Sequence, residues 1–349
     1  MEDMGLKEFY KDKKVLITGH TGFKGSWLTK ILSNWGADIA GYSLNPPTIL
    51  NLYDTLDVDI NSVIGDIRDY DKIFDLFDAF KPEIVIHMAA QPLVLESYKN
   101  PKSTYEINVN GTVNVCEAVR KTDCVKSFVN VTTDKVYENL ETAQAYCEND
   151  KLNGYDPYSN SKSCSDIITQ SYFKSFLRSL GISTSTVRSG NVIGGGDFSP
   201  NRIVPDCIRA ALDDEVIFIR HPESIRPYQH VLEPLNLYLI VAMKQYEDIS
   251  YSSSYNIGPN KEDCVETLKL VELFAKYWEG FRWDTLGDSG PHEAKFLHLD
   301  STKIKEEFNW APRWNIDTAI SKTVEWAKAY KKNKDTNKII DNQIKEFYT

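Results

Sequence analysis

The chain has 349 residues, of which 42% are hydrophobic and 26% charged, and its formal net charge is −10. This length predicts one large domain or two fused domains. The acidic balance argues against general affinity for nucleic acid or anionic membrane, so an anionic ligand needs a local basic pocket. No stretch approaches the roughly 18 apolar residues of a membrane span, and residues 1–14 lack a leader's apolar segment. A cytoplasmic protein is expected.

The cysteines show no pattern of a disulfide framework or a metal site. None forms a CxxC pair, and none lies near a histidine at metal-ligand spacing. Free thiols in a reducing compartment and no bound metal are therefore expected. The six are Cys116, Cys124, Cys147, Cys164, Cys207 and Cys264.

The first half of the chain alternates apolar runs with segments of helical periodicity. Strands are expected at 15–18, 38–42, 62–65, 83–88, 127–132 and 184–188, and helices at 24–35, 70–80, 103–121 and 159–180. Such βα repeats predict an α/β fold, a Rossmann-type doubly wound parallel sheet with helices on both faces. Ligands of these sheets bind at the carboxyl ends of the strands.

A glycine-rich turn joins the first expected strand to the first expected helix. Gly19, Gly22 and Gly25 have the spacing G-x-x-G-x-x-G. Glycines allow a tight turn and close backbone approach to a pyrophosphate, and the helix N-terminus attracts its charge. A generic βα turn is the alternative. A dinucleotide site is favoured, and its residues in this turn are Gly19, Thr21, Gly22, Phe23, Lys24 and Gly25.

The choice between NAD and NADP depends on the end of the second strand. Residues 42–45 contain no acidic side chain for the ribose hydroxyls and no Arg for a 2′-phosphate, although Lys24 could serve one. NAD is preferred and NADP stays open. Asp66 and Ile67 follow the third strand, where an Asp can accept from the adenine amino group; a helix N-cap is the alternative for Asp66.

After Arg188 the βα rhythm ends in a region rich in Gly and Pro, and periodic segments return near 234–243 and 265–278. We expect residues 1–190 to form the dinucleotide-binding domain, with a returning segment near 228–258. Residues 191–227 and 259–335 are expected to form a smaller C-terminal α/β substrate lobe. The Lys- and Asn-rich stretch after Lys328 is expected to be a solvated terminal helix, with residues 336–349 as the terminal tail.

Tyr158 and Lys162 are four residues apart at the start of an expected helix. Asp156 suits the N-cap and Pro157 the first helical position, which places Tyr158 and Lys162 on one face of the first turn. A neighbouring ammonium and the helix N-terminus favour the phenolate, so a lowered Tyr158 pKa is expected. Such a Tyr can accept a hydroxyl proton while hydride leaves the same carbon.

The expected strand at 127–132 ends in a run of polar residues, Thr132, Thr133, Asp134 and Lys135. Two hydroxyls, a carboxyl group and an amine then lie at the carboxyl end of a central strand. A polar loop start is the alternative. With Tyr158 and Lys162 in the next helix, an active site is favoured.

Five stretches resemble the extended short-chain dehydrogenase/reductase family: 19–25, 87–91, 108–112, Tyr158 with Lys162, and 188–194. Four carry a closer resemblance to the nucleotide-sugar 4,6-dehydratases, in particular to the branch acting on CDP-glucose: 19–28, 89–94, 132–137 and 226–231. The resemblance covers nearly the whole chain. It implies that Ala89, Ala90, Gln91, Asn108 and Thr132 also contact NAD.

The resemblance also implies a chemistry that begins with oxidation at C4 of the sugar. Tyr158 takes the C4 hydroxyl proton while hydride passes to NAD, Lys162 tunes Tyr158 and holds the nicotinamide ribose, and Thr133 bonds the C4 oxygen. Water then leaves across C5 and C6, with Asp134 as general acid, and the hydride returns to C6. The wider family has Glu where this chain has Lys135. Either the pKa of Lys135 is lowered, or another group takes the C5 proton.

Substrate residues are expected in the loop-rich half. Arg202, Arg220 and Arg226 are suited to a diphosphate, with His230 and Asn191 beside them, although a single Arg is more often a surface ion-pair partner. By resemblance the substrate is a nucleotide-diphosphate sugar, CDP-glucose. A homodimer formed through the helices after Ser103 and Ser159 is also expected. Alternatives are an epimerase or reductase, a dehydratase for another sugar nucleotide, or a dinucleotide sensor, for which Tyr158 and Lys162 have no use.

Overall fold

The computed structural model describes residues 2–140, 145–286 and 298–349. Its main element is a seven-stranded sheet in which all neighbouring strands are parallel, in the order β3-β2-β1-β4-β5-β6-β10. The predicted doubly wound parallel sheet is confirmed. Its strands are β1 (Lys14–Thr18), β2 (Asp38–Ser43), β3 (Asn61–Ile64), β4 (Ile84–His87), β5 (Ser127–Val131), β6 (Ser183–Ser189) and β10 (Ser254–Ile257).

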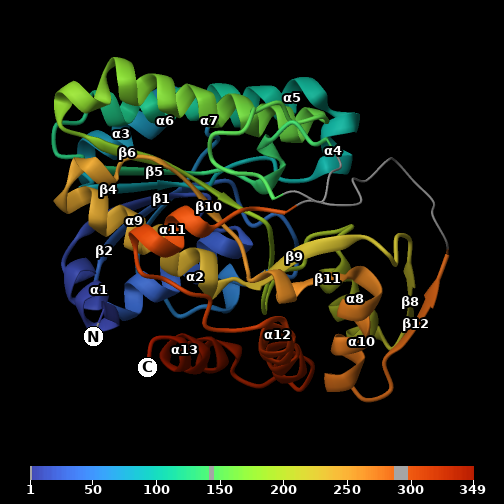
Figure 1. Ribbon diagram of the computed structural model, residues 1–349. Helices are drawn as coiled ribbons and strands as arrows, with labels where there is room; N and C mark the ends of the chain where they lie inside the picture. The colour runs from blue at the N-terminus through green and yellow to red at the C-terminus, as the bar shows by residue number, and fades with distance from the viewer. Residues whose placement is uncertain (1, 141–144, 287–297) are drawn as a thin grey trace.

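Helices cover both faces of this sheet. In Figure 1, α3, α6 and α7 lie above it and α1, α2 and α9 lie below it. The expected apolar stripe of α2 is buried at Trp27, Leu28, Ile31 and Leu32. Such a stripe joins a helix to a sheet. The helices are α1 (Glu2–Tyr10), α2 (Phe23–Asn34), α3 (Tyr70–Phe80), α4 (Val94–Lys99), α5 (Pro101–Tyr105), α6 (Gly111–Arg120), α7 (Pro157–Ser175) and α9 (Leu232–Glu247).

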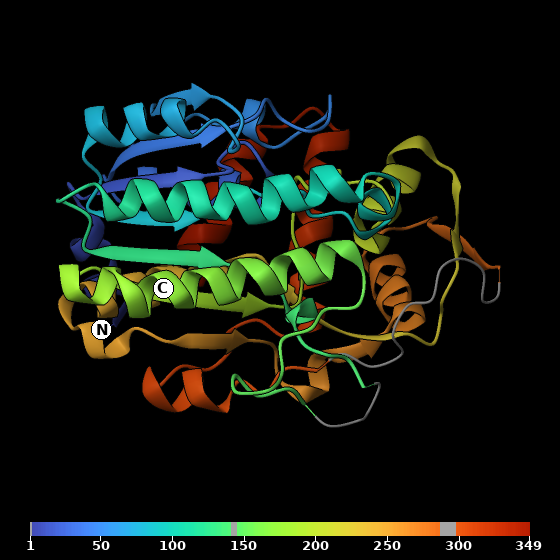
Figure 2. The same cartoon turned by 90° about the horizontal axis from the view of Figure 1, so that it is seen from above.

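Two small sheets lie beyond the carboxyl ends of the main strands, on the side to which the strand arrows point in Figure 2. One has the order β11-β9-β7 and the other pairs β12 with β8. The helix expected from Val265 begins only at Thr267, because residues 264–266 pair with β9 as a strand. The elements of this lobe are β7 (Asn191–Ile193), α8 (Ile203–Asp213), β8 (Val216–Ile219), β9 (Ile225–His230), β11 (Cys264–Glu266), α10 (Thr267–Tyr277) and β12 (Arg282–Thr285).

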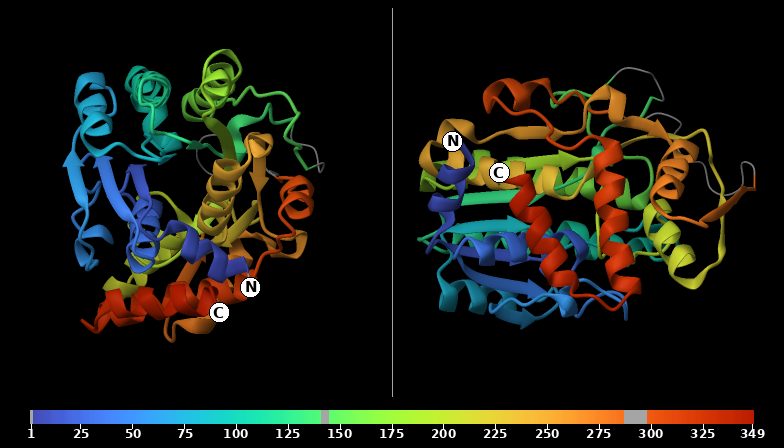
Figure 3. Two further views of the ribbon diagram at one scale, coloured as in Figure 1. Left: turned by 90° about the vertical axis from the view of Figure 1, so that its left-hand side faces the viewer. Right: turned by 90° about the horizontal axis from the view of Figure 1, so that it is seen from below.

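The end of the chain packs back onto the molecule as α11 (Thr302–Glu307), α12 (Ile316–Lys331) and α13 (Thr336–Phe347). Figure 3 shows α13 beside α12, with both termini on the same side. Ile340, Ile344 and Phe347 are buried in the main core. The expectation of a solvated tail is therefore wrong, because these three side chains recur on one face of α13 and that face packs against the core.

None of the helices in the described ranges has the length and apolar character needed to cross a membrane. All six cysteines are free thiols. Neither the described His and Cys residues nor the carboxylates gather into a group of three that could hold a metal ion.

Candidate active site

The turn between β1 and α2 has the backbone form that a dinucleotide requires. Gly19 has a positive φ of 80°, and a Cβ there would lie 2.9 Å from the nitrogen of Ala89. At Gly25 a Cβ would lie 2.0 Å from the Gly19 oxygen. Gly22 precedes α2 and offers no side chain to its first N–H groups, and the first turn carries no acidic residue. These N–H groups suit a pyrophosphate.

Thr21 fastens this turn to the end of β2. Its hydroxyl lies 2.8 Å from the hydroxyl of Ser43 and donates to the carbonyl of Leu44 at 2.8 Å. Lys24 points elsewhere: its ammonium donates to the Tyr238 hydroxyl at 3.4 Å, on α9. The suggestion that Lys24 serves a 2′-phosphate is therefore wrong, because that phosphate lies at the end of the second strand in such folds.

Asp66 lies at the end of β3, held by Arg68. The guanidinium donates from Nη2 to Oδ2 at 2.6 Å and from Nε to Oδ1 at 3.0 Å, which lowers the pKa of Asp66. Asp69, not Asp66, is the N-cap of α3, so the alternative reading of Asp66 as that cap is wrong. Ile67 is buried, and its carbonyl accepts from Asn114 Nδ2 at 3.0 Å.

The helix expected at 103–121 is interrupted by a π-helical turn, Glu106–Asn110, which contains Asn108. Asn108 Oδ1 accepts from the Gln91 N–H at 2.8 Å, and Nδ2 donates to the Gln91 carbonyl at 3.1 Å and to Ser161 Oγ at 2.9 Å. The amide thus ties the turn after β4, which also carries Ala89 and Ala90, to α7. Turns of this kind are frequent at functional sites.

The start of α7 is built as predicted. Asp156 accepts from the Ser159 N–H at 3.0 Å, and Pro157 is the first helical residue. Tyr158 and Lys162 follow on one face. The ammonium of Lys162 is buried and donates to the carbonyl of Val131, the last residue of β5, at 2.9 Å.

The polar run after β5 meets Tyr158. The Thr133 hydroxyl lies close enough to Tyr158 to lower the pKa of the phenol, and it donates to Asp134 Oδ1 at 2.9 Å. Lys135 Nζ lies 3.5 Å from the same oxygen of Asp134. Asp134 Oδ2 is buried and finds no hydrogen-bond partner among the described residues. A hydroxyl, a carboxyl group and an amine therefore form a connected group beside the phenol of Tyr158.

The electrostatics differ from the expectation for Tyr158. Burial raises its pKa to about 12, because desolvation outweighs the hydrogen bond with Thr133 and the charge of Arg202. The prediction of a lowered pKa is therefore wrong for the protein alone. Burial also lowers the pKa of Lys162 to about 7, and the charge of Lys24 acts in the same direction.

Thr132 faces away from this group. Its hydroxyl donates to Asp166 Oδ2 at 3.1 Å, so the side chain is committed to the interior rather than to a coenzyme. Thr133, by contrast, caps the short turn that follows β5, where its hydroxyl meets Asp134. Asp166 forms a buried ion pair with Arg188 at 2.8 Å. Asp166 was missed, although its place four residues after Lys162 puts it on the same helical face.

The expected substrate residues are dispersed. Arg202 lies just before α8, 3.5 Å from Asp197, and its charge acts on both Tyr158 and Lys24. Arg220 directly follows β8, and its charge acts on Asp206 of α8.

The other three expected substrate residues lie on the β7–β9 sheet. Arg226 is largely buried in β9, and Asn191 opens β7 opposite Tyr228. His230 is fully buried, with its ring against Trp27 and Trp314. A role for His230 in contacting substrate is therefore wrong.

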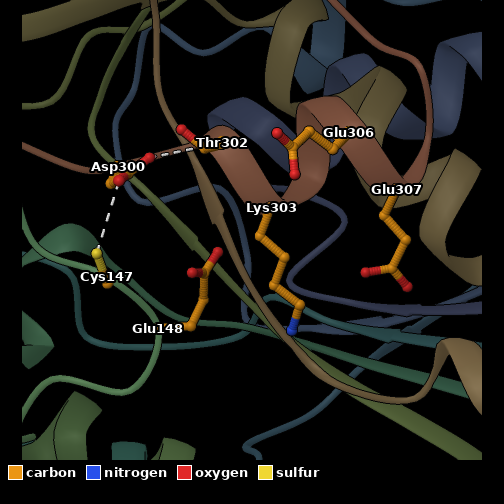
Figure 4. A pocket seen from close by; sticks show the side chains of 7 residues that line it. All are labelled: Cys147, Glu148, Asp300, Thr302, Lys303, Glu306 and Glu307. Atoms are coloured by element: carbon orange, nitrogen blue, oxygen red, sulfur yellow. Dashed lines mark hydrogen bonds between the residues drawn. The ribbon is translucent and has the colours of Figure 1, made fainter.

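A separate surface pocket of about 550 Å³ lies between residues 147–148 and α11, and contains none of the predicted site residues. Figure 4 shows its side chains, with Lys303 among several carboxylates. Cys147 Sγ and Asp300 Oδ2 are 3.6 Å apart across it. Its full lining is Cys147, Glu148, Asp300, Thr302, Lys303, Glu306 and Glu307.

Solved structures with this fold include sugar-nucleotide enzymes. A dTDP-glucose 4,6-dehydratase from Bacillus anthracis, in complex with NAD, superposes with a TM-score of 0.77 at 23% identity, over 92% of this chain and 98% of that one. An epimerase from Methanothermobacter thermautotrophicus superposes with a TM-score of 0.84 at 18% identity, over 98% of both chains. These likenesses show the fold.

Sequence comparison shows the family. The model of the family described as GDP-mannose 4,6 dehydratase matches residues 16–323. A CDP-glucose 4,6-dehydratase from Salmonella typhimurium is 42% identical over 338 residues, which cover 94% of each chain. The range of the family model begins within β1 and ends within α12, so it includes the glycine turn, the run after β5 and the start of α7. The chain therefore belongs to the GDP-mannose 4,6 dehydratase family of nucleotide-sugar 4,6-dehydratases.

Proposed function

We propose that the protein is an NAD-dependent hydro-lyase that converts CDP-D-glucose to CDP-4-dehydro-6-deoxy-D-glucose. The relative that is 42% identical bears the name of this activity. The observation that carries the proposal is that Asp134 accepts from Thr133, whose hydroxyl acts on Tyr158. An epimerase that only oxidises and reduces C4 has no need of an acid for a departing C6 hydroxyl. Asp134 beside Tyr158 therefore favours dehydration.

The described residues fit NAD. Gly19 and Gly25 have no side chains, so the backbone of the turn can lie close to a pyrophosphate. The start of α2 offers its free N–H groups to the same pyrophosphate. At the end of β2 the hydroxyl of Ser43 is present, whereas the ammonium of Lys24 binds Tyr238 on α9 and is not available to a 2′-phosphate there. This arrangement favours NAD over NADP. When bound, NAD supplies a positively charged ring that accepts hydride from C4 and later returns it to C6.

Tyr158 and Thr133 act on the C4 hydroxyl. Tyr158, as phenolate, takes its proton, and the Thr133 hydroxyl holds the same oxygen. Because burial raises the pKa of Tyr158 to about 12, forming the phenolate needs added positive charge. Lys162 supplies part of it from one helical turn away, where its ammonium is fixed on the Val131 carbonyl.

Asp134 and Lys135 act on C5 and C6. The ketone at C4 acidifies C5, the C5 proton leaves, and the C6 hydroxyl departs as water after Asp134 protonates it. Lys135 lies 3.5 Å from Asp134 Oδ1, so a proton can pass from its ammonium to the carboxylate. The neutral amine then takes the C5 proton, and the carboxylic acid gives its proton to the departing C6 hydroxyl, which restores the ammonium and the carboxylate. We assign the C5 proton to Lys135. In deuterated water a Lys135→Met variant should still oxidise C4 but incorporate little deuterium at C5. Normal incorporation would overturn this assignment.

The diphosphate of the substrate needs cations, and the lobe beyond the sheet supplies them. Arg202 is the cation whose charge reaches Tyr158, and α8 begins directly after it. We infer that Arg202 and the start of α8 hold the diphosphate. Arg202→Met should raise KM for CDP-glucose by about tenfold or more with a smaller effect on kcat. A change confined to kcat would contradict this assignment.

We also infer a homodimer that joins through α7. Ile167, Phe176 and Leu180, on and just after this helix, are 50%, 45% and 56% exposed, which is unusual for large apolar side chains. Light scattering coupled to gel filtration should give twice the chain mass of 39.8 kDa. Ile167→Glu should give the monomer, whereas a wild-type monomer would refute the inference.

The test of the proposed function is product analysis with four sugar nucleotides. Purified protein with NAD is incubated separately with CDP-glucose, dTDP-glucose, UDP-glucose and GDP-mannose, and the 4-keto-6-deoxy product is measured. Turnover of CDP-glucose alone is expected. Tyr158→Phe should lower kcat by about a hundredfold to ten-thousandfold with NAD still bound. An epimerised product, or an active Tyr158→Phe enzyme, would overturn the proposal.

A further inference from the structure

The ammonium of Lys24 lies inside the candidate site, although the residue belongs to the glycine turn. It stands over the ring of Tyr238, 5.7 Å from the centroid, and 3.4 Å from the hydroxyl. That hydroxyl is 2.8 Å from Ser189 Oγ, at the last residue of β6. The cation is therefore held between the start of α2 and the carboxyl ends of the central strands.

The charged groups that interact with Lys24 belong to the candidate active site. Arg202 and Asp134 act on Lys24, and Lys24 in turn acts on Lys162. Burial is the main reason that the pKa of Lys24 is lowered to about 8. The side chain is thus still largely an ammonium at neutral pH, and because Lys24 is only partly exposed, solvent ions screen its charge less than that of a surface lysine.

The position of this cation matters for a dinucleotide. The pyrophosphate belongs at the start of α2, and the reactive ring must reach the sugar carbon whose hydroxyl meets Tyr158 and Thr133. Lys24 lies between these two places. A nicotinamide ring held here would be positively charged in NAD⁺ and neutral in NADH, so a fixed cation nearby would act differently on the two forms.

We propose that Lys24 makes the bound coenzyme a stronger oxidant, because its fixed charge destabilises NAD⁺ relative to NADH and so favours the first step, oxidation at C4. The inference rests on the proposed NAD chemistry. An ordinary phosphate-binding lysine would behave differently: the pyrophosphate is the same in both coenzyme forms, so losing such a lysine weakens both equally. The ratio of the two dissociation constants separates these roles.

The first experiment measures Kd for NAD⁺ and for NADH by calorimetry in wild-type protein, Lys24→Met and Lys30→Met. Lys30 is the matched control, a lysine on the same helix whose ammonium pairs with Asp341 at 3.2 Å. The ratio Kd(NAD⁺)/Kd(NADH) should fall by about tenfold in Lys24→Met, as for one buried charge at an effective dielectric near 20 or above. It should not change in Lys30→Met.

Two outcomes would overturn the proposal: an equal rise of both constants in Lys24→Met, which marks a phosphate ligand, or an unchanged ratio. Binding of neither coenzyme by the wild-type protein would overturn the proposed function itself, and with it this inference. If Lys24→Met does not fold, Lys24→Gln takes its place. Turnover of CDP-glucose is measured in parallel, so that a working dehydratase with an unchanged ratio rejects the Lys24 role alone.

A pH series gives a second readout that uses the wild-type protein. The groups facing Lys24 are Tyr238, Asp134, Arg202 and Lys162. Because Lys24 also lowers the pKa of Lys162, the comparison is repeated in a Lys162→Met background, where the difference between the two ratios reports Lys24 alone. This difference should be present at pH 7 and vanish above about pH 9, as the ammonium with its pKa of about 8 loses its proton. A difference that stays constant to pH 9.5 would contradict the proposal.

Discussion

A buried carboxyl group on α9 makes the stability of this protein depend on pH. Glu233 is inaccessible to solvent, and its Oε1 accepts from the N–H groups of Arg313 at 2.8 Å and Trp314 at 2.7 Å. Burial raises its pKa from 4.5 to about 7 despite these two donors. Glu233→Gln keeps the oxygen acceptor and removes the titration.

The sign and size follow from linkage. Below pH 4.5 the group is protonated in both the folded and the unfolded chain. As the pH rises from 4.5 to about 7, the unfolded chain loses the proton first, so the free energy of unfolding falls. Each pKa unit is worth about 1.4 kcal/mol, which gives a loss of about 3 kcal/mol by pH 8. The Gln variant does not suffer this loss, while any cost of its extra amide is the same at every pH.

The assay is urea unfolding of wild type, Glu233→Gln and Glu247→Gln at pH 5, 6, 7 and 8. Glu247 is the control, an exposed carboxylate on the same helix. The free energy of unfolding of Glu233→Gln minus that of wild type should rise with pH by about 3 kcal/mol, and that of Glu247→Gln should stay flat. A Glu233→Gln difference that is equal at pH 5 and pH 8 would refute the reasoning.

Three further changes test the site and its support. Asp134→Asn should slow water loss more than C4 oxidation, so NADH should accumulate in single-turnover absorbance; equal slowing of both steps would count against the acid role. Gly25→Ala places a Cβ 2.0 Å from a carbonyl oxygen of its own turn and should lower both NAD affinity and the unfolding temperature, whereas Gly5→Ala, with nothing within 4 Å, should lower neither. Asp166→Asn leaves Arg188 buried without a carboxylate and should cost about 3–5 kcal/mol in urea unfolding; a loss below 1 kcal/mol would show that water reaches the guanidinium.

The features that could be predicted from sequence depend on neighbours close along the chain. Uninterrupted apolar runs such as Val15–Ile17 are typical of strands buried on both faces, and they allowed the parallel sheet to be predicted. The start of α7 was predictable because Asp156 and Pro157 are local signals and a four-residue spacing fixes one helical face. Thr133 and Asp134 could be placed because they follow a strand directly.

The features that failed depend on contacts between distant segments. His230 is enclosed by Trp27 and Trp314, and no local pattern shows which elements supply those rings. Lys24 lies in a glycine turn of the kind that binds phosphate, which suggested a phosphate contact. Its ammonium instead points toward Tyr238, on a helix far along the chain. The pKa of Tyr158 was mispredicted because desolvation depends on how completely the surrounding elements close over the phenol.

The return of the chain as α9 and β10 makes the dinucleotide half inseparable from the rest. Tyr10 donates to the carbonyl of Leu239 at 2.8 Å, Ser127 to that of Ala242 at 2.9 Å, and β10 pairs with β6 along its whole length. A fragment ending at residue 190 would expose to water the faces of β5 and β6 that α9 covers, and would leave the edge of β6 without its partner β10. Such a fragment should aggregate rather than fold. Because α9 and β10 lie in the chain between the segments of the smaller lobe, that lobe is not one continuous stretch that could be cut out and replaced as a unit.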